Sequence, residues 1–253
     1  MRSVHGDSSL TTDAITEMAM SYEFVRLKSA SLSLVGGSGE LRSHLNVSVK
    51  VKNVAYSKDV QIHYRGQCDS AWQDKPLTWK GNFGNYDVFA LEPALDLDAT
   101  QFVEFAIRFV AGGTTYWDDN SSANYSLVPS AGALTGDNVT LSFANLVFGG
   151  TPGSSYVTGI AGEILVNNIS YSKNVGVRHS SAGWTSSVDI GASYSQSFGG
   201  GSLERWIFGR NLSPEAFGRG EFAVYCQSGE TGQCFWDDNF TQNYDMRYRE
   251  RLE

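Results

Sequence analysis

Residues 117–125 read Trp-Asp-Asp-Asn-Ser-Ser-Ala-Asn-Tyr, and residues 236–244 read Trp-Asp-Asp-Asn-Phe-Thr-Gln-Asn-Tyr. Each stretch places short carboxylate and amide side chains between two aromatic residues. This composition is too polar for a core strand and too rich in turn-forming residues for a helix. We therefore expect a loop at each place, and the recurrence indicates that the structure around the loop is duplicated.

Two further pairs of segments show that the repeat extends over a whole domain. Residues 51–60 (Val-Lys-Asn-Val-Ala-Tyr-Ser-Lys-Asp-Val) match residues 166–175 (Val-Asn-Asn-Ile-Ser-Tyr-Ser-Lys-Asn-Val), and Glu-Phe-Ala-Ile at 104–107 matches Glu-Phe-Ala-Val at 221–224. The copies lie about 115 residues apart, a typical domain length and several times a solenoid repeat. The expected boundaries are an N-terminal tail at 1–20, a first domain at 21–127, a linker at 128–137, a second domain at 138–246 and a C-terminal tail at 247–253.

Strand patterns fill both expected domains. Val47, Val49 and Val51 alternate with Ser48 and Lys50, which is the period of a strand with one buried face. Similar short runs recur about every ten residues between clusters of Gly, Asn and Asp, a pattern typical of β-sandwiches. The sequence therefore predicts an all-β protein of two tandem β-sandwiches, with one or two helical turns at residues 12–20 of the tail.

Catalytic chemistry has few candidates in this sequence. Asp118 with Asp119, and Asp237 with Asp238, are paired acids of the kind that support general acid/base work. Neighbouring acids on one loop are weak evidence for it, however, and His63 and His179 are better explained as strand residues. We find no Ser/His/Asp set, no His/Cys metal spacing and no phosphate-binding loop. The sequence predicts no catalytic residue, no metal site and no cofactor.

Aromatic residues favour a different function. Several lie in or beside loops rich in Gly, Asn, Asp and Ser, where packing does not require large rings. An exposed ring suits a sugar, because the C–H face of a pyranose stacks on it while nearby polar groups bond the hydroxyls. The alternative is that some rings are hydrophobic plugs at the sandwich ends, above all Trp72 and Trp184. The candidates are Trp72, Trp79, Tyr86 and Trp117 in the first copy, and Trp184, Tyr194 and Trp236 in the second.

Taken in order, these motifs resemble carbohydrate-binding module family 21. The family includes the starch-binding domain of some fungal glucoamylases and the glycogen-targeting domain of protein phosphatase 1 regulatory subunits. The resemblance covers both halves of the chain. It implies an immunoglobulin-like β-sandwich in each domain, and non-catalytic binding of α-1,4-glucan through two aromatic surfaces.

The resemblance also implies which residues form each surface. The first, which we call the tyrosine surface, would use Tyr56 with Trp79 and Tyr86, and in the second copy Tyr171 with Tyr194. The second, the tryptophan surface, would use Trp72 with Trp117, and Trp184 with Trp236. Leu203 stands where the second copy would have its last aromatic residue. The implied polar partners are Asn53, Lys58, Asn120, Asn168, Lys173 and Asn239.

Charge and cysteine content bear on partners and compartment. The net charge is −8 without a block of Lys or Arg, which argues against nucleic acid or an anionic membrane as the partner. Residues 1–20 lack the features of a secretory signal, so we expect a cytoplasmic protein, or a secreted one if a signal has been removed. Cys226 and Cys234 flank a predicted hairpin and could pair after export; in the cytoplasm they and Cys68 would be free thiols.

The sequence thus predicts a non-catalytic, lectin-like protein that binds a polysaccharide or oligosaccharide, α-1,4-glucan such as starch or glycogen being the expected ligand. Three alternatives stay open. The chain could be a scaffold that holds a phosphatase or another enzyme on glycogen, a binding protein for a different glycan such as β-glucan, or an enzyme that uses the Asp118 and Asp119 loop.

Overall fold

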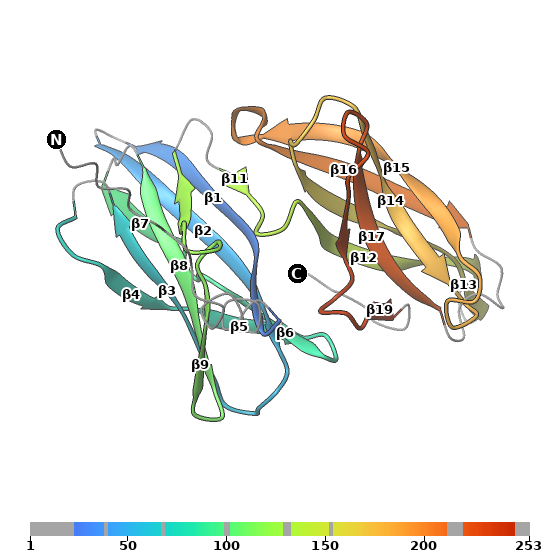
Figure 1. Ribbon diagram of the computed structural model, residues 1–253, viewed down its shortest axis with the longest axis horizontal. Coiled ribbons are helices and arrows are strands. Elements are labelled where there is room, and N and C mark those ends of the chain that lie inside the picture. Colours follow the sequence, from blue (N-terminus) through green and yellow to red (C-terminus); the bar gives the residue numbers. More distant parts are fainter. Residues whose placement is uncertain are drawn as a thin grey trace, which may run out of the picture.

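The computed structural model describes residues 23–37, 40–66, 69–98, 102–128, 133–151, 154–211 and 220–245. Both expected tails, including residues 12–20, lie outside these ranges, and so does Cys68. The described chain forms two lobes that lie side by side (Figure 1). Apart from one short 3-10 turn, η2 (Gly199–Gly201), the regular structure of the described residues is entirely strand. The expectation of an all-β protein is confirmed.

The first domain is a sandwich of two antiparallel sheets. One sheet has the order β11-β1-β2-β6-β5, with β7 also on β2, and the other has the order β10-β8-β3-β4, with β9 also on β8. The strands of the first sheet are β1 (Val25–Gly37), β2 (Glu40–Lys52), β5 (Thr78–Asn82), β6 (Tyr86–Ala90), β7 (Leu95–Asp98) and β11 (Ala133–Leu134). Those of the second are β3 (Lys58–Gly66), β4 (Gln73–Pro76), β8 (Val103–Ala111), β9 (Thr114–Asp118) and β10 (Tyr125–Leu127).

The second domain repeats this arrangement with its sheets joined. Strand β15 pairs with β14 through its first residues and with β16 through the rest, which gives the continuous order β12-β13-β16-β15-β14-β17-β18 with β19 on β17. In the first copy the same segment is divided into β4 and β5 by Leu77. The strands are β12 (Val139–Thr151), β13 (Ser154–Asn167), β14 (Lys173–Ser180), β15 (Val188–Phe198), β16 (Leu203–Asn211), β17 (Glu221–Ser228), β18 (Cys234–Asp237) and β19 (Tyr244–Asp245).

The alternating pattern in the sequence accounts for the cores. Val47, Val49 and Val51 on β2 are buried, and they pack with the large rings Phe105 and Phe109 of β8. Alternate residues of a strand point to opposite faces, so each such run contributes one apolar face to the space between the sheets. Burial of this apolar area is the main source of stability in each sandwich.

The segment between the domains is attached to both of them. Ala133 and Leu134, within the expected linker at 128–137, pair with β1 of the first domain as strand β11. One residue later, the backbone N–H of Thr135 donates to Oδ1 of Asn167 in the second domain at 3.2 Å. The described part of the linker therefore contributes to the structure of both sandwiches.

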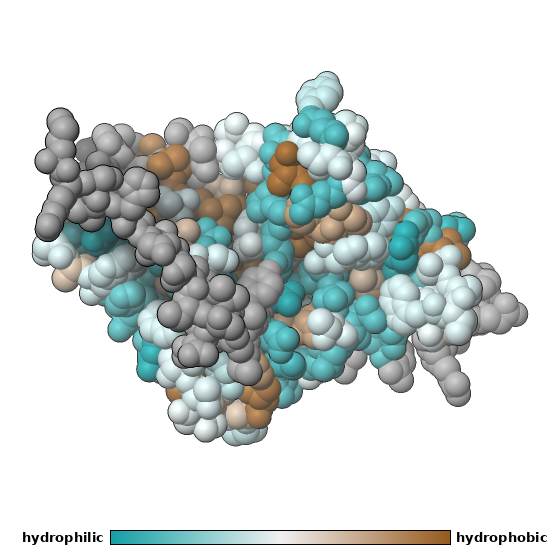
Figure 2. Space-filling model, in the orientation of Figure 1, coloured by the Kyte–Doolittle hydropathy of each residue, from teal (hydrophilic) through white to brown (hydrophobic). Residues whose placement is uncertain are grey.

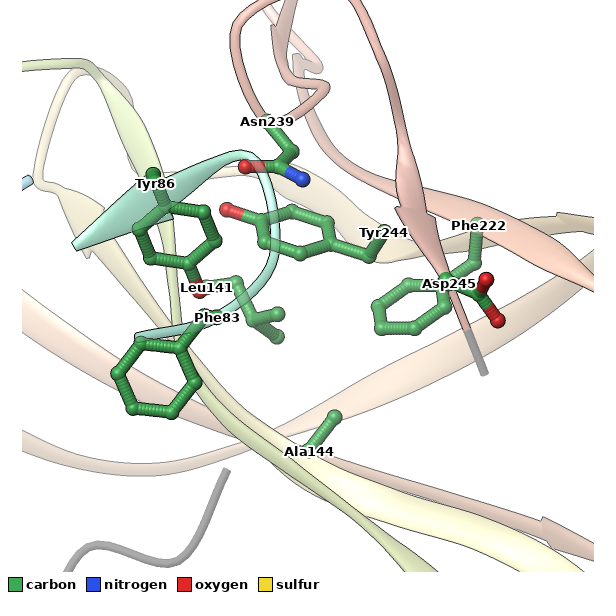
Figure 3. A pocket seen from close by; sticks show the side chains of 8 residues that line it. All are labelled: Phe83, Tyr86, Leu141, Ala144, Phe222, Asn239, Tyr244 and Asp245. Carbon is green, nitrogen blue, oxygen red and sulfur yellow. The ribbon is translucent and has the colours of Figure 1, made fainter. Parts of the chain in front are cut away.

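The domains pack through an outer sheet face of the first. Tyr86 and Val88 of β6 belong to one buried cluster with Leu141 and Phe240 of the second domain. Figure 3 shows Tyr86 and Tyr244 side by side in this contact. The cavity between them has a volume of about 30 Å³, which is enough for only a few water molecules. The packing around Tyr86 is thus close and leaves no room for a sugar there, whereas a larger cavity of about 790 Å³ lies elsewhere between the domains and is lined by residues of both.

Free cysteines occur at both described positions. Cys226 is buried and Cys234 is exposed, and neither forms a disulfide. In the β17–β18 ladder, Cys226 lies opposite Phe235, and Cys234 lies opposite Gln227. The two cysteines are therefore on neighbouring pairs of the ladder and do not face each other. Burial raises the pKa of Cys226 to about 11, so its thiol stays protonated and unreactive at neutral pH.

Candidate functional site

The first aspartate of each repeated acidic loop has a structural role. In the first domain, the carboxylate of Asp118 is buried and accepts hydrogen bonds from the Leu27 N–H at 2.6 Å and the Tyr125 hydroxyl at 2.7 Å. In the second domain, Asp237 accepts from the Leu141 N–H at 2.9 Å and the Tyr244 hydroxyl at 2.7 Å. Each aspartate therefore ties its loop to the first strand of its own sandwich.

The asparagines of these loops hold an unusual backbone. Asn120 and Asn239 have positive φ, as do three further residues of each loop, and Asn tolerates this left-handed region better than most residues. The Asn120 side chain donates to the Asn124 carbonyl at 2.9 Å, and Asn239 donates to the Asn243 carbonyl at 2.8 Å. The loops are thereby fixed, and they hold the tryptophan that precedes each of them.

The tryptophan surface of the first domain is a cluster of three rings. Trp72 stacks on His63 with centroids 4.8 Å apart, and Trp117 meets the same imidazole edge-on at 5.9 Å. The Arg65 guanidinium also lies 5.0 Å from the Trp72 centroid, so Trp72 is largely covered, whereas Trp117 is exposed. The structure brings the expected pair Trp72 and Trp117 together through His63. Sequence reasoning missed this role, although His63 occupies an outward position of an alternating strand.

An arginine replaces this histidine in the second domain. His63 pairs with Ala106 and Arg178 pairs with Ala223, which makes the two positions equivalent. The Arg178 guanidinium lies 5.1 Å from the Trp236 centroid and forms two hydrogen bonds to Asp189, at 2.7 and 2.8 Å. The side-chain hydrogen bond from Arg178 lowers the pKa of Asp189.

Trp184, the partner expected for Trp236, is also held by a polar contact. Its indole N–H donates to Oε2 of Glu221 at 2.7 Å. Both tryptophans are exposed, but the charged pair of Arg178 and Asp189 occupies the surface beside Trp236. The two tryptophan surfaces therefore differ in polarity.

The tyrosine surfaces are the most exposed aromatic groups of the molecule as described. Tyr56 has a relative exposure of 105% and Tyr171 one of 99%. Trp79 and Tyr194 are also exposed, and each lies beside a β-bulge in a corresponding pair of strands, opposite Phe89 and Trp206 respectively. The matching register identifies Trp79 and Tyr194 as equivalent.

Trp206 is an addition that sequence reasoning missed. Its ring meets Tyr194 edge-on at 5.8 Å, and its indole N–H donates to Oε2 of Glu204 at 2.9 Å. In the sequence, Trp206 is an aromatic residue within a predicted strand, and this pattern does not distinguish it from a core residue. It supports the Tyr194 ring from the neighbouring strand.

Two further expected site residues lie in the contact between the domains. Tyr86 has a relative exposure of only 3%. Leu203, which pairs with Asn167 as Tyr86 pairs with Lys52, is the equivalent residue of the second domain and is also buried. Asn239 is buried and donates to Oδ1 of Asn85 in the first domain at 2.9 Å. The prediction that Tyr86 and Asn239 contact sugar is therefore wrong, because each side chain is buried against the other domain.

The expected lysine ligands lie beneath the surface. The Lys58 ammonium is 2.7 Å from the Asp87 carboxylate and donates to Oδ1 of Asn53 at 2.8 Å. Lys173 is 3.1 Å from Glu204 and donates to Oδ1 of Asn168 at 2.8 Å. Both lysine side chains are buried, so their predicted contact with sugar is wrong.

These lysines instead brace the loops that carry the tyrosines. Asn53 donates to the Gly84 carbonyl at 3.2 Å, and Asn168 donates to the Gly201 carbonyl at 2.8 Å. Asn53, Asn120 and Asn168 remain exposed, and their contact with sugar stays a prediction.

Figure 2 shows the apolar residues on one face of the molecule in separate small patches among hydrophilic ones. Among the described residues, no group of three or more His, Cys, Asp or Glu is placed to hold a metal ion. Within the same ranges, no helix has the length and apolar composition needed to cross a membrane.

Comparison with known proteins agrees with this geometry. The sequence matches the carbohydrate/starch-binding module (family 21) over residues 21–128 and 150–247. Two matches in tandem, over most of the chain, show that the protein belongs to this family. The two matched regions correspond to the two sandwiches.

Similar proteins include both regulatory subunits and an enzyme. Protein phosphatase 1 regulatory subunit 3B of Danio rerio is 32% identical over 91 residues, which are 33% of this chain and 30% of that protein. Glycogen-binding subunit 76A of Drosophila melanogaster is 36% identical over 88 residues, 34% of this chain and 12% of that protein. Glucoamylase 1 of Rhizopus oryzae is 30% identical over 93 residues, 34% of this chain and 15% of that protein. The matched region thus spans less than a third of each of these relatives.

A similar solved structure is that of the starch-binding domain of Rhizopus oryzae glucoamylase in complex with beta-cyclodextrin and maltoheptaose. It is 26% identical and covers 43% of this chain and 92% of that chain, with a TM-score of 0.30.

Proposed function

We propose that the chain is a non-catalytic protein that binds α-1,4-glucan, as in starch or glycogen, through exposed aromatic rings on both domains. The observation that carries the proposal is the recurrence of the tyrosine surface. Tyr56 with Trp79, and Tyr171 with Tyr194, present exposed rings on equivalent loops and strands. Rings held on strands and braced loops lose little freedom when a sugar stacks on them.

A polymeric ligand fits the duplication. A glucan chain bound at one surface raises the effective concentration of its other sugar units near the next surface, and overall binding then exceeds that of either surface alone. The names of the relatives support glucan as the ligand, since they include a glycogen-binding subunit and a glucoamylase.

The burial of Asp118 and Asp237 supports the absence of catalysis. Each carboxylate is held by a backbone N–H and a tyrosine hydroxyl inside its sandwich. A general acid or base must reach the reacting group within hydrogen-bond distance, and neither carboxylate is placed to do so for a polysaccharide outside.

A pull-down on insoluble starch, beside insoluble β-glucan and chitin, tests this function. We expect retention on starch and release by soluble maltooligosaccharide. Retention on β-glucan or chitin alone would contradict α-glucan specificity, and retention on none of the three would contradict the proposal as a whole.

A second candidate is a scaffold that holds an enzyme on glycogen. It is favoured by the similarity to protein phosphatase 1 regulatory subunits. Co-purification of a phosphatase catalytic subunit with the tagged chain from cells would support this role. The scaffold role includes glucan binding, so the starch experiment applies to it as well.

A further inference from the structure

The two tyrosine surfaces differ in the hairpin that lies beside them. In the first domain, the turn between β8 and β9 consists of Gly112 and Gly113 alone, and open space surrounds both positions. In the second domain, the turn between β17 and β18 is longer and covers residues 229–233. The longer turn provides side chains at a place where the first domain has none.

This longer turn packs against the loop that carries Tyr171. The Gly229 N–H donates to the Ser172 carbonyl at 2.7 Å. A Cβ atom at Gly229 would lie 2.5 Å from Oγ of Ser172, so the close approach requires glycine. The turn is also fixed internally, because Oγ of Ser228 accepts the N–H groups of Glu230 and Thr231 at 3.3 and 3.2 Å. The carboxylate of Glu230 is thereby held at a defined place.

Glu230 contacts the tyrosine directly. Its Oε1 atom accepts the backbone N–H of Tyr171 at 3.0 Å. Its Oε2 atom has no hydrogen bond to any part of the chain that the structure describes, and the residue is exposed. A charged acceptor with one oxygen available thus lies at the backbone of the residue whose aromatic ring is fully open to solvent.

This pairing matches the surface of one glucose unit. The apolar C–H face of the sugar can cover the Tyr171 ring, and hydroxyls project from the rim of the same sugar towards the carboxylate. Hydrogen bonds to an ionised acceptor are about twice as strong as neutral ones. Because Glu230 is already bonded to the Tyr171 backbone, the carboxylate and the loop that carries the ring are positioned together before the sugar arrives.

We infer that Tyr171 and Glu230 form a glucose subsite in the second domain that the first domain lacks, with Oε2 of Glu230 accepting a sugar hydroxyl. The inference rests on the proposed function. It makes the tyrosine surface of the second domain the tighter of the two, and the one that discriminates between sugars by their hydroxyls.

The test uses a variant that keeps the tyrosine surface of the second domain, and then removes in turn the Glu230 carboxylate and each sugar hydroxyl. A background variant carries Ala at Tyr56, Trp79, Trp117, Trp184 and Trp236, and so retains Tyr171 with Tyr194. Titration with maltotriose, and with maltotriose analogues that each lack one hydroxyl, is carried out with and without Glu230→Gln. Glutamine keeps an oxygen for the Tyr171 N–H but removes the charge.

We expect Glu230→Gln to weaken maltotriose binding about tenfold or more, the usual effect of losing a hydrogen bond to a charged group. One deoxy analogue should bind the background variant more weakly than maltotriose does. The same analogue and maltotriose should bind equally well once Glu230→Gln is added. This non-additivity requires direct contact, because a carboxylate that only shaped the loop would not select one hydroxyl. Asp59→Asn is the matched control, since this exposed carboxylate of the first domain bonds to Gln61.

Unchanged binding after Glu230→Gln, or losses that simply add for every analogue, would overturn the inference while leaving the proposed function intact. Absence of maltooligosaccharide binding by the unmodified chain would instead overturn the proposed function and, with it, this subsite. Equal melting temperatures of all variants would show that the fold is preserved.

Discussion

The Nζ atom of Lys50 in the first domain lies 2.9 Å from Oδ2 of Asp237 in the second, and both side chains are buried. The lysine also donates to the Tyr244 hydroxyl at 2.6 Å. Burial alone would raise the pKa of Asp237, but the charge and hydrogen bond of Lys50 outweigh it and lower the pKa. In Asp118, the equivalent residue, burial prevails and raises the pKa. The two equivalent aspartates therefore differ in pKa because only Asp237 pairs with a lysine of the other domain.

Replacement of Lys50 should destabilise the contact between the domains. Lys50→Met leaves the Asp237 carboxyl buried without its lysine partner, and we expect a loss of about 3–5 kcal/mol in the free energy of unfolding at pH 7. Denaturant unfolding measures this loss. Lys52→Met, on the same strand but partly exposed, should have a much smaller effect, and Asp237→Asn added to Lys50→Met should recover part of the stability. Equal losses for Lys50 and Lys52 would contradict the role of the ion pair.

Tyr86 should matter for stability and not for glucan binding. Its ring fills the contact between the domains, so Tyr86→Ala should reduce the free energy of unfolding by about 3 kcal/mol, as for other large buried rings. The affinity of the folded variant for maltoheptaose should stay within about twofold of the original. Calorimetric unfolding and titration measure the two effects. A tenfold loss of affinity without a loss of stability would restore Tyr86 to the binding surface.

Tyr56 and Tyr171 should show the opposite behaviour. Both rings are fully exposed, so replacement by Ala should change the free energy of unfolding by less than about 0.5 kcal/mol. Each replacement should weaken binding to maltoheptaose, and the double variant should lose more binding to starch than to the short sugar, because avidity is lost. Sedimentation with starch granules beside titration separates the two effects. A double variant that sediments like the original chain would contradict this assignment.

The tryptophan surfaces should contribute unequally. Trp117 is exposed beside an imidazole, whereas the Arg178 guanidinium lies over Trp236 and pairs with Asp189. Trp117→Ala should therefore weaken maltoheptaose binding more than Trp236→Ala does, while melting temperatures change little. Fluorescence titration of both variants provides the comparison. A large fall in melting temperature for either one would identify that ring as a plug of the sandwich instead.

Asp137 should make stability depend on pH. Burial, together with the nearby carboxylates of Asp237 and Asp238, raises its pKa from 3.8 to about 8 and outweighs the Arg26 guanidinium, which lies 3.8 Å away. The folded state therefore binds a proton that the unfolded state releases between these values, so this group makes stability fall as pH rises from about 4 to about 8. Asp137→Asn should remove that part of the decline and raise the melting temperature most at pH 8. Identical pH profiles for the two chains would contradict the assignment.

Sequence alone predicted the parts of this molecule that depend on local pattern. The alternation of Val47, Val49 and Val51 gave the core face of β2, and the repeated loops gave the duplication. Tyr56 and Tyr171 were expected on the surface because the segments that contain them, residues 51–60 and 166–175, resemble the family's motif. All of these features need only a few neighbouring residues to be recognised.

The errors concern contacts between residues far apart in the chain. Nothing near Tyr86 shows that Leu141 and Tyr244 of another domain will cover it. Lys58 and Lys173 resemble exposed ligands until the register of β6 and β16 places Asp87 and Glu204 beside them. Similarly, Glu230 gained its significance only when the folded hairpin was seen to contact Tyr171, 59 positions away in the sequence.

The central claim is that the exposed rings of the tyrosine surfaces bind α-glucan. Isothermal titration of maltoheptaose into the unmodified chain, and into a variant with Ala at Tyr56, Trp79, Tyr171 and Tyr194, tests it most directly. We expect saturable binding to the unmodified chain, weakened at least about tenfold in the variant, with equal melting temperatures. Undetectable binding to the unmodified chain, or equal affinity of the two proteins, would contradict the claim.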